Sequence, residues 1–138
     1  MIKTKVLFLC SANSCRTQMA EALLRDLGGD RFEVASGGAE VTPLDPEAIQ
    51  AMREIGIEIS RQAPKDVSLF LGQRFSYVIS LCDRKKEPSC PIFPGAIWRL
   101  HWAIDNPDLA PTLEERRKVV RRVRDEIREK VSEFVANA

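Results

Sequence analysis

A short apolar run that ends in a cysteine, followed by a small polar loop and a helical pattern, limits the folds open to this chain more than any other feature. Residues 6–9 are typical of a buried strand, and apolar positions at helical spacing begin after Arg16. Five residues separate Cys10 from Arg16, so the loop can curl until its backbone N–H groups converge at the helix N-terminus, where they attract an anion. The same positive end stabilises a Cys10 thiolate, and the Arg16 guanidinium can bind two oxygens of a tetrahedral oxyanion. The segment therefore predicts a site for a phosphate-like ion beside a nucleophilic thiol.

Cys10 also has a simpler interpretation, as a small hydrophobic residue that closes a core strand, which is the commonest role of a free cysteine. Two observations favour the site. Cys10 stands at the end of a strand, where open α/β sheets bind their ligands, and Arg16 follows at a suitable spacing.

The rest of the chain alternates between strand and helix patterns. Strands are expected over residues 32–35, 75–81 and 97–102, and helices from Pro46, over residues 64–71 and over residues 113–135. Thr112 and Glu115 form a capping box for the last helix. Strands separated by helices predict an α/β fold with a parallel sheet flanked by helices on both faces. The length of 138 residues fits a single domain over residues 1–138.

The charge balance favours small-molecule chemistry. Lysine plus arginine number 21 against 20 acidic residues, so the net charge of +1 gives no broad attraction to nucleic acid. The basic run over residues 116–124 is interleaved with acidic side chains, which is typical of a solvated helix face. No apolar run reaches the length of a signal peptide core or a membrane span. We therefore expect a cytoplasmic monomer that binds neither nucleic acid nor membranes.

The four cysteines, Cys10, Cys15, Cys82 and Cys90, would suggest two structural disulfides in a secreted chain. In a reducing cytosol, cysteines at strand ends and in a proline-rich loop favour catalytic or redox roles. Seven residues separate Cys82 from Cys90, enough for their α-carbons to reach disulfide distance. A zinc site is disfavoured because there is no C-x2-C pair and the single histidine, His101, lies in an apolar strand pattern. No metal ion is expected.

From Cys10 the chain reads Cys-Ser-Ala-Asn-Ser-Cys-Arg-Thr, and Gln-Met-Ala-Glu follows. This pattern resembles the arsenate reductases built on the low-molecular-weight tyrosine phosphatase fold, and the resemblance extends over essentially the whole chain. It implies a four-stranded parallel sheet of the phosphotyrosine phosphatase I type and an enzyme without a cofactor. It also implies an oxyanion site formed by Ser11, Ala12, Asn13, Ser14, Cys15, Arg16 and Thr17.

The resemblance further implies a relay of three thiols in arsenic detoxification. In it, Cys10 attacks arsenate, Cys82 attacks the sulfur adduct and expels arsenite, and Cys90 moves the disulfide outward for thioredoxin to reduce. Cys82 follows a strand as Cys10 does, so adjacent parallel strands would bring the two thiols together. Cys15 has no role in this scheme, and we interpret it as a packing or loop-structure residue.

Two other functions stay open. A low-molecular-weight phosphatase acting on phosphotyrosine or a small phosphate ester would need one nucleophile, Cys10, an oxyanion cradle and a general acid. A non-catalytic oxyanion or redox sensor would use the last helix to engage a partner. A phosphatase has no use for Cys82 and Cys90, so these residues favour the reductase.

The chain departs from the family pattern at the general acid. Asn106 stands directly before Pro107, where the family carries an aspartate, and asparagine cannot donate a proton as an acid does. Asp105 is our candidate for this role, with Asp108 as the alternative. A reductase tolerates the loss better than a phosphatase, because oxygen exchange is easier at arsenic than at phosphorus.

Two further departures concern the loops. Ala12 replaces a glycine, which requires a negative φ at this position. The segment between Cys82 and Cys90 is one residue longer than in the family.

Some of the reductases hold a potassium ion near the loop. Asn13, Glu21 and Ser36 match three of its ligand positions, but the fourth, an aspartate in the family, is Lys65 here. We expect the charge of Lys65 to replace the cation, and no potassium site is predicted.

Overall fold

The computed structural model describes residues 2–83 and 90–138. Within these ranges it contains four strands, three α-helices and three short 3-10 helices. The strands are β1 (Thr4–Cys10), β2 (Phe32–Gly38), β3 (Phe75–Ser80) and β4 (Ala96–His101). The α-helices are α1 (Arg16–Gly28), α2 (Pro46–Arg53) and α3 (Leu113–Asn137), and the 3-10 helices are η1 (Gly29–Arg31), η2 (Val67–Phe70) and η3 (Pro107–Leu109).

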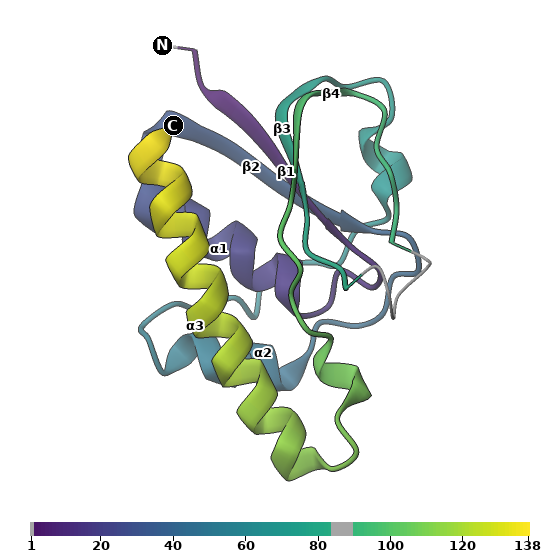
Figure 1. The fold of residues 1–138 in the computed structure, drawn as a ribbon, viewed down its shortest axis with the longest axis vertical. Helices are drawn as coiled ribbons and strands as arrows, with labels where there is room; N and C mark the ends of the chain where they lie inside the picture. Colours follow the sequence, from purple (N-terminus) through teal and green to yellow (C-terminus); the bar gives the residue numbers. More distant parts are fainter. Residues whose placement is uncertain (1, 84–89) are drawn as a thin grey trace.

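The four strands form one parallel sheet in the order β2-β1-β3-β4 (Figure 1). Leu9 of β1 lies beside Gly37 of β2 and Ser80 of β3, so these three strands end at the same edge of the sheet. Cys10 is the last residue of β1 at this edge. The predicted four-stranded parallel sheet is confirmed.

The two faces of the sheet have different covers. All three α-helices lie on one face, and their apolar sides share a buried cluster with strand residues such as Phe8 and Ile79. The opposite face buries Leu7 and Phe75 against Phe93 and the short helix η2, which Figure 1 shows on the other side of the sheet from α3. The predicted fold class is therefore confirmed, although the second face carries a 3-10 helix in place of an α-helix. No helix in the described part of the chain is long and apolar enough to cross a membrane.

The helix predicted over residues 64–71 is wrong in type and length, since only Val67–Phe70 is helical, as η2. Asp66 forms an isolated parallel bridge with Gly38, and the Gly38 N–H donates to the Lys65 carbonyl over 2.9 Å. This pairing holds residues 65 and 66 extended beside the end of β2. The Asp66 side chain then accepts the Ser68 N–H over 2.8 Å and starts a turn that leaves room for one 3-10 segment.

The other helices begin and end close to the predicted signals. Asp45 caps α2 by accepting the Glu47 N–H over 2.9 Å, with Pro46 at the first helical position. Thr112 caps α3 by accepting the Glu115 N–H over 3.1 Å. Gly29 follows α1 with φ of 57°, a conformation that favours glycine.

Candidate active site

The loop between β1 and α1 turns its carbonyl oxygens outward. Three of them accept backbone N–H groups from the segment that follows β2. These bonds join Glu40 to Ser11 (2.8 Å), Thr42 to Ala12 (3.2 Å) and Asp45 to Ser14 (2.9 Å). The Asn13 carbonyl accepts the Gln18 side-chain amide over 2.9 Å, again away from the loop centre.

The outward carbonyls determine where the loop N–H groups point. In a trans peptide, the carbonyl of one residue and the N–H of the next point in opposite directions. The N–H groups of Ala12, Asn13, Ser14 and Cys15 therefore face the inside of the loop. The Asn13 N–H donates to Cys10 Sγ over 3.2 Å, which marks the centre of this cradle. The loop thus has the arrangement of N–H groups that binds an anion.

Asn13 supplies the conformation that closes the loop. Its φ is 53°, and it is the non-glycine residue with positive φ within the described ranges. Asparagine tolerates this region better than most residues. Ala12 keeps a negative φ, so the alanine that replaces the family glycine is accommodated as predicted.

Gly38 lets the end of β2 approach the back of the loop. A Cβ at this position would lie 2.8 Å from the Asn13 nitrogen and 2.9 Å from the Ala12 carbonyl carbon. Both are backbone atoms, so they could move away only if the loop itself moved. A glycine is required here by close packing.

The Cys10 sulfur is buried and has Thr17 Oγ1 as a polar neighbour besides the Asn13 N–H. Thr17 Oγ1 lies 3.1 Å from it, and the same oxygen accepts the Asn13 side-chain amide over 2.8 Å. Because Thr17 Oγ1 already accepts one hydrogen bond, its own proton can be donated to sulfur. Thr17 and the Asn13 N–H thereby stabilise a Cys10 thiolate.

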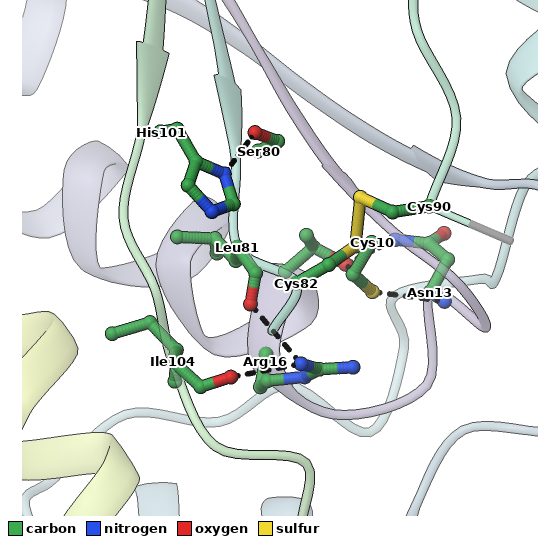
Figure 2. Close-up of a disulfide and its surroundings, with 10 residues drawn as sticks. Cys10, Asn13, Arg16, Ser80, Leu81, Cys82, Cys90, His101 and Ile104 are labelled. Carbon is green, nitrogen blue, oxygen red and sulfur yellow. Dashed lines mark hydrogen bonds between the residues drawn. A yellow bond between two sulfur atoms is a disulfide. The ribbon is translucent and has the colours of Figure 1, made fainter. Parts of the chain in front are cut away.

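Arg16 is the first residue of α1 and is only 4% exposed. Its Nη1 donates to the carbonyls of Leu81 (3.1 Å) and Ile104 (3.0 Å), between which Figure 2 shows the guanidinium. Leu81 follows β3 and Ile104 follows β4, so two crossovers of the chain fix this side chain. The anchored fork lies in the same pocket as Cys10 and can bind two oxygens of an oxyanion.

Cys82 and Cys90 form a disulfide with a Cα–Cα distance of 6.0 Å (Figure 2). Cys82 is fully buried, whereas Cys90 is partly exposed. The Leu81 N–H donates to the Leu9 carbonyl over 2.8 Å, so Cys82 and Cys10 are the next residues at the ends of two neighbouring strands. The structure thus joins Cys82 to Cys90, in a segment that is hydrogen-bonded to the end of β1.

The low molecular weight phosphotyrosine protein phosphatase family matches residues 5–138. This chain belongs to that family. Within it, an arsenate reductase of Halalkalibacterium halodurans is 42% identical over 135 residues, which cover 97% of this chain and 96% of that protein. The resemblance inferred from the loop is therefore confirmed.

Solved structures of arsenate reductases have folds similar to that of this chain. One described as an arsenate reductase in oxidized state is 32% identical, with a TM-score of 0.79, and the match covers 97% of this chain and 98% of that chain. A thioredoxin-dependent arsenate reductase of Corynebacterium glutamicum is 26% identical, with a TM-score of 0.70, over 99% of this chain and 64% of that chain.

The pocket of this family member contains Asp108 and leaves out Asp105. It is lined by Cys10, Ser11, Ala12, Ser14, Cys15, Arg16, Asn106 and Asp108. The Asn106 side chain accepts the Asp108 N–H over 3.0 Å, which forms a tight turn between the two residues. Asp105 lines a different pocket, where it pairs with Arg122 over 3.0 Å.

An arginine that the sequence did not point to holds Asp108 in place. Arg116 of α3 donates to Asp108 over 2.8 Å and also pairs with Asp45, the cap of α2. The hydrogen bonds that Arg116 donates to these carboxylates, the one to Asp45 first, raise the pKa of Arg116. In the sequence, Arg116 appears only as part of the basic run of α3, and that run predicts a solvated helix face.

Cys15 lies at the N-terminus of α1 and is 6% exposed. Burial, followed by the nearby Asp45 carboxylate, raises the pKa of its thiol well above the ordinary value. Cys15 is thus held as a neutral thiol, which fits a packing role.

The cation next to Glu21 is Arg25, and the expectation for Lys65 is wrong. Arg25 Nη1 pairs with Glu21 Oε2, whereas Lys65 contributes its backbone N–H, which donates to Asn13 Oδ1 over 2.7 Å. The spacing of Glu21 and Arg25, four residues apart on a helix, is the signal that could have predicted the pair. No group of three or more histidine, cysteine or carboxylate residues suited to a metal ion occurs in the described ranges.

Proposed function

We propose that this protein reduces arsenate to arsenite through a relay of Cys10, Cys82 and Cys90, with thioredoxin as the electron donor. The observation that carries the proposal is the Cys82–Cys90 disulfide at the end of β3, beside an oxyanion cradle centred on Cys10. A phosphatase would gain nothing from this pair of thiols. The thioredoxin-dependent arsenate reductase of Corynebacterium glutamicum supports the choice of donor.

In the first step, the Cys10 thiolate attacks the arsenic of a bound arsenate and one oxygen leaves as water. The inward loop N–H groups and the Arg16 guanidinium hold the remaining oxygens. The bond that forms is S–As, and the arsenic is still in its +5 state. The leaving oxygen needs protons, which come from solvent or from an acid in the pocket.

In the second step, the Cys82 thiolate attacks Cys10 Sγ. The S–As bond breaks, its electron pair stays on arsenic, and arsenite departs with arsenic in the +3 state. The two electrons come from the two thiols, which become a Cys10–Cys82 disulfide. Cys90 then attacks Cys82, so that Cys10 is released as a thiolate and the Cys82–Cys90 disulfide remains. Two thiols of thioredoxin finally reduce that disulfide in a reducing, cytoplasmic environment.

We propose Asp108 as the acid of the pocket in preference to Asp105. Asp108 shares the pocket with Cys10 and Arg16, and Asp105 is engaged by Arg122 elsewhere. The ion pair with Arg116 keeps Asp108 in position.

The alternative function is hydrolysis of phosphate monoesters through a Cys10 phosphoenzyme. The cradle, the nucleophile and Asp108 are the parts that such a reaction needs, and the family is named for it. Asn106 before Pro107 argues against an efficient phosphatase, because an amide cannot protonate the leaving alkoxide.

The test is a single turnover without reductant. Fully reduced protein is mixed with arsenate, quenched with acid, digested and mapped for linked cysteines by mass spectrometry. The relay predicts arsenite with Cys82 linked to Cys90 in the native sequence, and Cys10 linked to Cys82 in Cys90→Ser. If all four thiols stay free while a phosphate ester is hydrolysed by the same sample, the protein is a phosphatase.

A further inference from the structure

Glu21 is a buried carboxylate that is paired on both oxygens. Its side chain is 4% exposed. Oε1 accepts the Ser36 hydroxyl over 2.6 Å, and Oε2 pairs with Arg25 Nη1. Arg25 also donates from Nη2 to the Val34 carbonyl over 2.9 Å, so two contacts fix its guanidinium. The Arg25 side chain is 51% exposed, so it lies between the buried Glu21 carboxylate and the solvent.

A continuous set of hydrogen bonds joins this ion pair to the nucleophile. Ser36 donates to Glu21, and its own oxygen accepts the Asn13 side-chain amide over 3.0 Å. The same amide nitrogen donates to Thr17 Oγ1, which lies 3.1 Å from Cys10 Sγ. Two of the groups have a fixed role, since a carboxylate accepts and the Asn13 amide nitrogen donates, so Ser36 donates to Glu21 and accepts from Asn13. The charged state of Glu21 therefore orients the groups that contact the thiol.

A potassium ion does not fit among these residues. Asn13 Oδ1 already accepts the Lys65 N–H (2.7 Å) and the Gln18 amide (3.1 Å). Both Glu21 oxygens are engaged, and Ser36 both donates and accepts. An alkali ion would need these same oxygens as ligands. Of the three matched family positions, none presents an oxygen that is turned toward an added cation.

We infer that Arg25 is a positioning residue for Cys10 and that it supplies, from within the chain, the positive charge that Glu21 requires. A buried carboxylate without its charged partner is unfavourable. Glu21 would then shift, and the hydrogen bonds that link it through Ser36 to Asn13 would be disturbed as well. Arg25 touches neither the oxyanion nor the sulfur, so it acts through Glu21, Ser36, Asn13 and Thr17. This inference concerns the reactivity of Cys10 and holds for a reductase or a phosphatase.

The test measures alkylation of Cys10 by iodoacetamide at one pH, followed by peptide mass spectrometry, and does not depend on arsenate turnover. Arg25→Ala is expected to slow the reaction about 3-fold to 10-fold, as expected for a coupled hydrogen-bond network. Arg25→Lys, which keeps the charge, is expected to stay within about twofold of the native rate. Arg53→Ala is the matched control, because it removes an exposed arginine at the end of α2 that pairs with Glu58 over 2.7 Å.

A double substitution separates this role from a general effect on stability. In a Glu21→Gln background no charge needs to be balanced, so Arg25→Ala should cause little further change. If Arg25→Ala does not fold, as judged by circular dichroism, Arg25→Gln takes its place in both backgrounds. Should Glu21→Gln not fold, the comparison of Arg25→Ala with Arg25→Lys decides alone.

The native protein should react at the same rate in potassium and sodium buffers of equal ionic strength. Three results would overturn the inference. These are a potassium-specific increase of more than about twofold in the native protein, a native rate in Arg25→Ala, and equal effects of Arg25→Ala with and without Glu21→Gln.

Discussion

The backbone N–H of Leu81 donates to the carbonyl oxygen of Leu9 over 2.8 Å at the C-terminal edge of the sheet. Cys10 directly follows Leu9 and Cys82 directly follows Leu81, so this bond joins the two segments immediately before both cysteines. Arg16 adds a second link between the same segments, through the Leu81 carbonyl.

Replacing Cys82 should abolish arsenite formation without disturbing the cradle. In Cys82→Ser the S–As adduct on Cys10 has no thiol to attack it, and we expect a loss of at least about 10³-fold in arsenite production. Hydrolysis of p-nitrophenyl phosphate, if present in the native protein, should persist. Cys15→Ser is the control and should keep most of the reductase activity. Native arsenite production by Cys82→Ser would contradict the relay.

Substituting Gly38 tests the close contact behind the loop. The added methyl group in Gly38→Ala meets the backbone of Ala12 and Asn13 at 2.8–2.9 Å, so we expect the free energy of unfolding to fall by about 1–3 kcal/mol. Phosphate binding should weaken too, because the cradle must shift. Urea unfolding and calorimetric titration with phosphate measure the two effects.

Gly56→Ala is a suitable control for this experiment. Gly56 has φ of 81° with open space around the missing Cβ, so its substitution strains the backbone far from the loop. It should lower stability and leave phosphate binding unchanged. A Gly38→Ala protein that binds phosphate normally would show that the loop adapts.

The two aspartates of the acid loop should differ in their effect on ester hydrolysis. Asp108→Asn removes the carboxylate that shares the Cys10 pocket, and we expect about 10-fold to 100-fold lower phosphatase kcat. Asp105→Asn should stay within about twofold, since its partner is Arg122 in another pocket. Arsenate reduction should fall less than ester hydrolysis in Asp108→Asn. A larger loss in Asp105→Asn would reverse the assignment.

Cys15 should make the protein less stable in alkali. Its thiol has a raised pKa in the folded state, so the native protein holds this proton after the unfolded chain has released it. The contribution to stability is complete below the ordinary thiol pKa of about 8.5 and falls as pH rises above it, by at most about 1.4 kcal/mol per pH unit. Urea unfolding of reduced protein between pH 7.5 and 10 should show this slope in the native sequence and a smaller slope in Cys15→Ala. Equal slopes would contradict it.

The parts of the molecule that depend on neighbours in the sequence were predictable. The strand ending in Cys10, the helix from Arg16 and the caps at Asp45 and Thr112 rest on local patterns, and all of them are present. The placement of Cys10 and Cys82 after hydrogen-bonded residues of neighbouring segments follows from one topological rule, that parallel strands end at the same edge.

The wrong helix and the open choice of the acid residue both depend on partners that are distant in the chain. Residues 64–71 have helical propensity, but pairing of Asp66 with Gly38 holds their start extended. The choice between Asp105 and Asp108 depends on Arg116 and Arg122, which α3 brings from elsewhere. The expectation for Lys65 failed for a different reason. It relied on the family position alone, whereas the four-residue spacing of Glu21 and Arg25 on one helix favours the pair that is observed.

The outward carbonyls of the loop have a consequence for selectivity. Ser11, Ala12 and Ser14 are already hydrogen-bonded to the segment after β2, so the cradle loses little conformational freedom when an anion enters. A preformed ring of N–H groups recognises charge and tetrahedral shape, which arsenate and phosphate share. We therefore expect cellular phosphate to compete for the same place, and discrimination between the two ions to arise after binding, from how readily each central atom accepts sulfur.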